Sequence, residues 1–174
     1  MDHASRLVDL VDNSGHIVGT KKRADIDKRS DLYHTIFVVL CTPDHKIVLS
    51  KIPERQDLPN MYPHRYGAAA ATIRRHKETA AQAARRAIKN ELHIAGAALD
   101  HLDDDFLFLP GDNRSYISVF KLIHQTPTEY SQKDIAGLSV FSPKELQRTS
   151  EQHKDQFAPA FLAIWQKHHD ALVS

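Results

Sequence analysis

YGAAAATIRRHKETAAQAARRAIKNELHIAG, residues 66–96, contains the strongest helix signal in the middle of the chain and decides the interpretation of the fold. Thr79-Ala80-Ala81-Gln82 has the form of a capping box, in which the Thr79 hydroxyl accepts a hydrogen bond from the backbone N–H of Gln82. The residues that follow, AAQAARRAIKNEL, are strong helix formers. We therefore predict a helix that begins after Thr79. Its periodicity places positions 87, 90 and 91 on one face.

Strand patterns lie on both sides of this helix. Residues 6–23 predict a hairpin around the turn 12–15, and residues 34–42 and 46–51 predict two further strands. The segment 52–65 contains three prolines and is expected to be a loop. After the helix, residues 105–110 and 114–123 predict a second hairpin, and residues 137–141 predict a last strand. The triplet Asp103-Asp104-Asp105 is expected to form a solvated turn, although it could also recruit cations.

Helix signals return at the end of the chain. Ser142-Pro143-Lys144-Glu145 is another capping box, with proline in the favoured first turn. The core face of a terminal helix is then marked by Phe157, Phe161, Trp165 and Leu172. Strands interrupted by one central helix and closed by C-terminal helices predict an α/β protein, an α/β/α sandwich with a mixed central sheet.

Composition is that of a soluble protein made of a single domain, residues 1–174. The net charge of +1 gives no global field that would favour a nucleic acid polymer or a membrane as partner. Cys41 is the single cysteine, which excludes an internal disulfide and fits a reducing compartment; VVLCT suggests that it is buried. No signal peptide pattern opens the chain, so a cytoplasmic location is expected.

The central helix resembles a Nudix box. The pattern of that box is G-x5-E-x7-R-E-U-x-E-E-x-G-U, and this sequence matches it at Glu78, Arg86, Ile88, Glu91 and Ile94. The frame of nearly the whole chain is most similar to isopentenyl-diphosphate isomerase and to the hydrolases that share its layout. This resemblance implies a Nudix fold and a divalent-metal-dependent hydrolysis of diphosphate linkages. Arg86 would have a structural role in this frame, pairing with a loop acid.

The resemblance is incomplete where the family binds metal. The sequence has Thr72, Ala87, Asn90 and His93 where the pattern has glycine or glutamate. Mg²⁺ prefers anionic oxygens in octahedral geometry, and alanine supplies none. By resemblance, Glu91 and Glu78 remain as catalytic residues and as ligands of Mg²⁺ or Mn²⁺, so we expect weak activity at most.

Two further positions bear on the isomerase comparison. His34 falls where one metal-binding histidine of that family belongs, although a buried core histidine is an equal interpretation. Gly67 stands at the position of the catalytic cysteine, which argues against isomerase activity.

Cations gather around the expected cleft. In the isomerase-like frame they resemble the residues that grip a substrate diphosphate, whose charge must be offset by metal or by arginine and lysine side chains. We predict substrate binding by Arg23, Lys51, Arg55, Arg74, Arg75 and Lys77. The alternative is that RRHK, residues 74–77, is a solvated loop.

Three functions therefore stay open. The chain is a Nudix-type hydrolase acting on a small phosphorylated or diphosphorylated molecule, a catalytically silent Nudix domain that binds a nucleotide, a prenyl diphosphate or a protein, or an enzyme with repurposed chemistry. The sequence leaves the oligomeric state unassigned.

Overall fold

The computed structural model describes residues 5–27, 29–54, 62–111 and 113–174. Its main sheet contains seven strands within these residues, in the path β5-β4-β3-β8-β7, with β6 also on β3 and β9 also on β4. Their bounds are β3 His34–Cys41, β4 Ile47–Lys51, β5 Tyr66–Gly67, β6 Ala70–Ile73, β7 Leu99–Leu109, β8 Asn113–Ile123 and β9 Gly137–Phe141.

The central strand β3 explains where the sheet opens. On one side β3 pairs in parallel with β8 along its whole length. On the other side it pairs antiparallel with β4 only at Leu40 and Cys41, and antiparallel with β6 at residues 35–38. Because β4 and β6 share one edge of β3 but pair with different halves of it, they diverge. The sheet is thus split between them.

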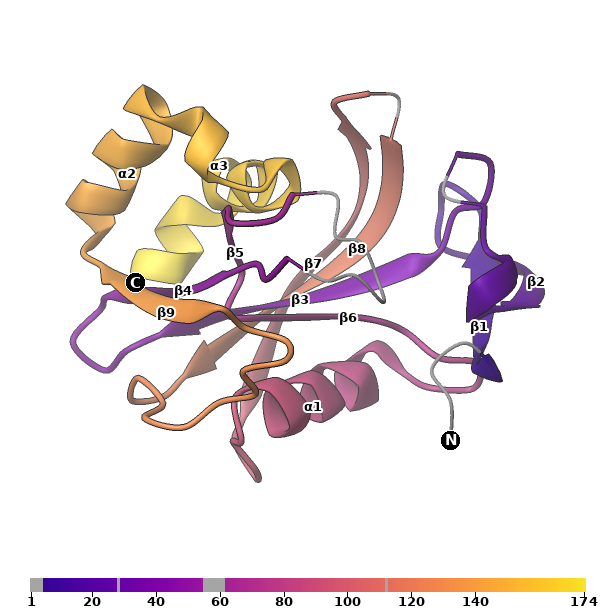
Figure 1. The fold of residues 1–174 in the computed structure, drawn as a ribbon, viewed down its shortest axis with the longest axis horizontal. Helices are drawn as coiled ribbons and strands as arrows, with labels where there is room; N and C mark the ends of the chain where they lie inside the picture. The colour runs from indigo at the N-terminus through magenta and orange to yellow at the C-terminus, as the bar shows by residue number, and fades with distance from the viewer. Residues whose placement is uncertain (1–4, 28, 55–61, 112) are drawn as a thin grey trace.

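Helices cover both faces of this sheet (Figure 1). α1 (Ala80–Glu91) lies on one face, and α2 (Pro143–Gln152) and α3 (Pro159–Val173) lie on the other. Ile36 and Ile88 belong to the core cluster under α1, whereas Val39 and Phe161 belong to the cluster under α3. This alternation along β3 is expected for a strand buried on both faces. The predicted α/β/α sandwich with a mixed sheet is confirmed.

A separate hairpin stands at the end of the sheet. β1 (Leu7–Val11) and β2 (Ile17–Lys22) form a two-stranded antiparallel sheet, followed by a 3₁₀ turn at Arg23–Asp25. Isolated β-bridges join this hairpin to the rest of the molecule, one between Val8 and Arg75 and one between Leu10 and Tyr33. The hairpin therefore brings residues from the start of the chain beside the segment that leads into α1.

Both predicted capping boxes are present. The side chains of Thr79 and Ser142 accept from the backbone N–H groups of Gln82 and Glu145, and the glutamine and glutamate side chains accept in return from the cap backbone. Cys41 is buried as predicted, and burial raises the pKa of its thiol to about 11. No helix in the described part of the chain combines the length and the hydropathy that a bilayer span requires.

Three sequence predictions need correction or refinement. Asp103-Asp104-Asp105 is not a turn, because it lies within β7, where Asp104 pairs with Ser118 of β8. The alanine-rich segment 66–73 supplies two strands, β5 and β6, that the sequence did not predict. Phe157 is fully buried, but it precedes α3 and follows the 3₁₀ turn Lys154–Gln156.

Candidate functional site

A cavity of about 510 Å³ occupies the split between β4 and β6. Its wall on the β6 side includes Ala71 and Ile73, and α1 contributes Ala87, Asn90 and Glu91. Apolar side chains line the opposite part, namely Phe37, Ile52, Pro53, Ala158 and Phe161. The two parts give the cavity a polar side and an apolar side, which is the usual character of a small-molecule site.

Arginines from three segments meet on the polar side. Arg6 precedes β1, Arg23 follows β2, and Arg75 lies between β6 and α1; all three line the cavity, together with Lys133. Partial burial lowers the pKa of Arg75, and the positive charges of Arg86, Arg6 and Arg23 lower it further. Arg75 therefore lies in the positive field of its neighbours. A site of this kind favours an anion.

Arg86 also lines the cavity, and hydrogen bonds hold its guanidinium group in place. Its Nε and Nη2 donate to the two carboxylate oxygens of Glu78 at 2.7 and 2.8 Å, and it also donates to Thr72 Oγ1 and the carbonyl oxygen of Ile73. Burial opposes ionisation of Glu78, but the hydrogen bonds from Arg86 and from the Arg75 backbone outweigh it and hold the pKa below its usual value. The predicted pairing of Arg86 with a loop acid is confirmed.

This pairing determines where Glu78 lies. Its carboxylate oxygens accept the bonds from Arg86 and the Arg75 N–H, and Glu78 is not among the residues that line the cavity. The structure thus places Glu78 behind Arg86, as a partner that orients a cavity-lining side chain. Its catalytic and metal-binding roles stay predictions from the family resemblance.

Glu91 lines the cavity at the end of α1. The carboxylate accepts a hydrogen bond from the Ala71 backbone N–H at 3.2 Å. The pKa of Glu91 is raised to about 8, mainly by burial and in addition by the charge of Asp134, while the Ala71 bond and Arg86 act in the opposite direction. The group is therefore mostly protonated at neutral pH, so it does not repel an anion bound near the arginines.

The residues around Glu91 do not supply the ligands that Mg²⁺ or Mn²⁺ prefers. Ala87 and Asn90 lie on the same cavity-lining face of α1. Ala87 offers no metal ligand, and Asn90 offers only a neutral amide oxygen. Within the described residues, no group of three or more histidine, cysteine, aspartate or glutamate side chains is arranged to hold a metal ion. Among the residues that line the cavity, Glu91 and Asp134 carry the carboxyl groups that could contribute to metal binding.

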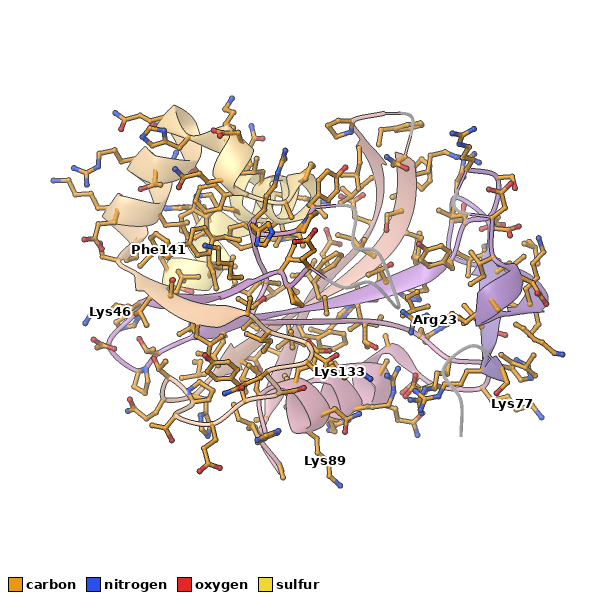
Figure 2. All side chains as sticks on the ribbon, in the orientation of Figure 1. Arg23, Lys46, Lys77, Lys89, Lys133 and Phe141 are labelled. Carbon is orange, nitrogen blue, oxygen red and sulfur yellow. The ribbon has the colours of Figure 1, made fainter. Side chains whose placement is uncertain are left out.

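The predicted cations are separated by the fold. Arg23 and Arg75 line the cavity, whereas Lys51, Arg74 and Lys77 do not. Arg74 points instead toward Asp9, with 3.9 Å between Nη2 and Oδ2, because successive residues of an extended segment face opposite sides. Figure 2 shows Lys77 at the periphery of the molecule, away from Lys133 above α1. Arg55 lies outside the described residues.

His34 also lies away from the cavity lining. It is buried, its Nε2 is 2.7 Å from Ser118 Oγ, and its ring packs edge-on against Tyr116. The pKa of His34 is lowered to about 4, mainly by burial and in addition by the positive charge of Arg74. The structure places it in the setting of a buried, neutral histidine, and its metal-binding role stays a prediction.

Sequence reasoning missed Arg6, Lys133 and Asp134 among the cavity-lining residues. Arg6 reaches the cavity through the β1–β2 hairpin, and the other two lie in the loop before β9. That loop is held on α1 by the Ser131 N–H, which donates to the Glu91 carbonyl oxygen at 2.8 Å, and the Ser131 hydroxyl donates to Asp134. No local pattern signals these long-range placements.

Comparisons with known proteins agree with this fold. No family model matches the sequence. A curated protein of Shigella flexneri, the uncharacterized Nudix hydrolase YfcD, is 23% identical over 169 residues, which cover 94% of this chain and 88% of the relative. The crystal structure of DR0079 from Deinococcus radiodurans matches with a TM-score of 0.69 at 18% identity, covering 84% of this chain and 90% of that one.

A mutT/nudix family protein from Listeria innocua matches with a TM-score of 0.60 at 18% identity, over 80% of this chain and 93% of that one. The chain has the fold of the Nudix superfamily, and the Nudix resemblance carried by its sequence is confirmed. The isomerase-like frame remains a prediction.

Proposed function

We propose that this protein binds a small diphosphate-containing molecule in the cavity between β4 and β6. The observation that carries the proposal is the convergence of Arg6, Arg23 and Arg75 on one side of a cavity of about 510 Å³. Guanidinium groups form paired, charge-assisted hydrogen bonds with phosphate oxygens, so several of them can offset a diphosphate charge. The protonated form of Glu91 adds a hydrogen-bond donor next to this charge.

Hydrolysis of a diphosphate linkage is the second part of the proposal. It is supported by the Nudix fold and by a relative that is named a Nudix hydrolase. Nudix hydrolases generally use divalent metals, but the described residues here do not fit such a site well. In this proposal Glu91, which lines the cavity, exchanges a proton with a bound phosphate or with water. We infer slow turnover, because one carboxyl group must replace several.

The alternative is a Nudix-fold module that binds its ligand without turnover. Two observations favour it: Glu78 is engaged by Arg86, and the burial of Glu91 keeps its carboxyl group mostly neutral at pH 7. Neither feature weakens anion binding. Both reduce the negative charge that a metal-dependent reaction needs.

Isothermal titration with inorganic diphosphate and with nucleoside and prenyl diphosphates, in Mg²⁺ and in EDTA, tests binding. We expect binding in EDTA, and an affinity loss of at least about tenfold in Arg75→Gln, since a charge-assisted hydrogen bond contributes roughly 1.5–3 kcal/mol. Arg85→Gln is the matched control, because Arg85 lies on the exposed face of α1. Absence of binding in both conditions would refute the proposal.

Turnover is tested with the same compounds in Mg²⁺ and Mn²⁺, comparing the wild type with Glu91→Gln. A rate that Glu91→Gln abolishes supports the hydrolase. Equal background rates in both proteins, with binding intact, support the binding module.

A further inference from the structure

A second polar site lies between β3, β6 and β1, away from the cavity. His34 begins β3 and faces the residue after β6, since the Arg74 N–H donates to the His34 carbonyl oxygen at 2.9 Å. The ladder Thr35–Ile73 to Val38–Ala70 sets this register, so the side chains of His34 and Arg74 lie on the same face. His34 is 5% exposed and the Arg74 side chain 15% exposed.

The hydrogen bonds of Ser118 fix the tautomer of His34. The Ser118 hydroxyl has one proton, which it donates to Asp104 in a short hydrogen bond. Its oxygen must therefore accept from His34 Nε2, 2.7 Å away. Nε2 carries the proton of a neutral ring, and Nδ1 is left as an acceptor. Nδ1 is buried and has no hydrogen-bond partner within the described residues.

Arg74 presents the complementary groups. Its Nε and Nη2 are donors on one edge of the guanidinium, and both are buried without a hydrogen-bond partner in the described part of the chain. The Asp9 Oδ2 atom is 3.9 Å from Nη2, which is too far for a direct hydrogen bond. The other Asp9 oxygen already accepts from His76 Nδ1 and from Thr20 Oγ1, at 2.6 and 3.2 Å.

We propose that one buried water molecule binds between Arg74, His34 and Asp9. It accepts from Nε and Nη2 of Arg74, donates one proton to His34 Nδ1, and donates the other to Asp9 Oδ2. A water with two to four polar partners is the usual solution for buried groups that would otherwise be unsatisfied.

Other small occupants do not meet the same requirements. A halide ion could accept from Arg74, but it has no proton for His34 Nδ1, and any anion would lie beside the Asp9 carboxylate. A cation would face the guanidinium. Only a species that both donates and accepts satisfies all three side chains.

The bound water completes a row of polar contacts across β7, β8, β3, β6 and β1. It adds a further contact between β1 and the segment that carries Arg75, which the Val8–Arg75 bridge already joins. The members of this row are His101, Asp104, Ser118, His34, Arg74, Asp9 and His76.

A crystal structure of the full chain at about 1.5 Å resolution tests the proposal. We expect one density peak within roughly 2.7–3.2 Å of Arg74 Nε and His34 Nδ1. A direct Arg74–His34 contact without such a peak would overturn the proposal. A bromide soak with an anomalous signal at this position would overturn it too, because the occupant would then be an anion.

Nuclear magnetic resonance of the ¹⁵N-labelled wild type gives an independent test that does not depend on a variant folding. We expect a protonated Nε2 and an unprotonated, hydrogen-bonded Nδ1 in His34. We also expect Arg74 Nε–H to exchange with solvent at least about tenfold more slowly than the exposed Arg85 Nε–H. A protonated Nδ1, or equal exchange of the two arginines, contradicts the bridge.

Discussion

At the scale of single residues, Glu91 and Glu78 show how one motif can place two acids in opposite environments. Glu78 is ionised and held by Arg86, while burial keeps Glu91 mostly neutral. The sequence shows both as glutamates at family positions and cannot distinguish them, because the difference comes from the hydrogen bonds to Glu78 and from the burial of Glu91 near Asp134. Their environments lead to separate predictions.

Glu91→Gln should flatten the dependence of stability on pH. The pKa of Glu91 is about 8 in the folded chain against an ordinary value of 4.5, so folding takes up a proton between these two values. The stability that Glu91 contributes is therefore greatest below pH 4.5 and is lost as the pH rises to 8. At pH 8 the variant should be more stable by about 2 kcal/mol, a value reduced for the partial exposure of Glu91.

Urea unfolding at pH 4.5, 6 and 8 measures this effect. Glu129→Gln, an exposed glutamate in the loop after β8, is the control and should follow the wild type. A Glu91→Gln profile parallel to that of the wild type would refute the assignment of a raised pKa.

Glu78→Gln should destabilise the fold by about 3 kcal/mol, because it leaves the Arg86 guanidinium partly buried without its carboxylate. The side chains of Arg86 and Glu78 are 18% and 14% exposed, so water cannot fully replace the lost partner. Thermal and urea unfolding measure the change. Arg85→Gln alters a neighbouring exposed arginine and should change stability by less than about 0.5 kcal/mol.

At the scale of elements, α1 was predictable and β6 was not. The capping box and the helix formers of α1 act locally, so the sequence reports them directly. β6 consists of Ala70–Ile73, where alanine has low strand propensity, and it exists because β3 offers a partner. The same strand explains why Arg74 and Arg75, adjacent in sequence, reach different sites.

Ala87→Glu combined with Asn90→Glu should create a Mg²⁺-dependent activity. Positions 87, 90 and 91 lie on the cavity-lining face of α1, so the double variant would place three carboxyl groups together. We expect Mg²⁺ binding by titration and diphosphate hydrolysis above the wild-type rate. Lys89→Glu with Arg85→Glu adds the same acids on exposed positions of α1 and should give neither. Tight Mg²⁺ binding by both double variants would show that the position of the acids does not matter.

At the scale of the whole molecule, the cavity depends on segments that are distant in sequence. Arg6, Arg75 and Lys133 come from the N-terminal hairpin, the entry to α1 and the loop before β9. The fold class follows from the order of strand and helix patterns. The identity of the cavity residues does not, because it depends on how those elements are arranged in space. Of the predicted cations, Arg23 and Arg75 line the cavity, while Arg74 and Lys77 do not.

Diphosphate affinity should fall as ionic strength rises, since charge attraction carries the proposed binding. Raising NaCl from about 0.05 M to about 0.5 M should weaken binding by roughly tenfold in the wild type. Arg75→Gln should show a shallower dependence, because one of the interacting charges is gone. Titrations at four salt concentrations measure both slopes, and identical slopes would exclude Arg75 from the binding site.

The split of the sheet also has a mechanical consequence. β4 and β6 do not bond to each other along the cavity, and each is attached to β3 by its own short ladder. The two walls are also tied together outside β3. β5 pairs with β4 and leads into β6 after two residues, and the loop before β9 is bonded both to α1 and to the end of β4. A displacement of one wall relative to the other would have to distort all of these connections, so we expect the cavity to keep its width when a ligand binds.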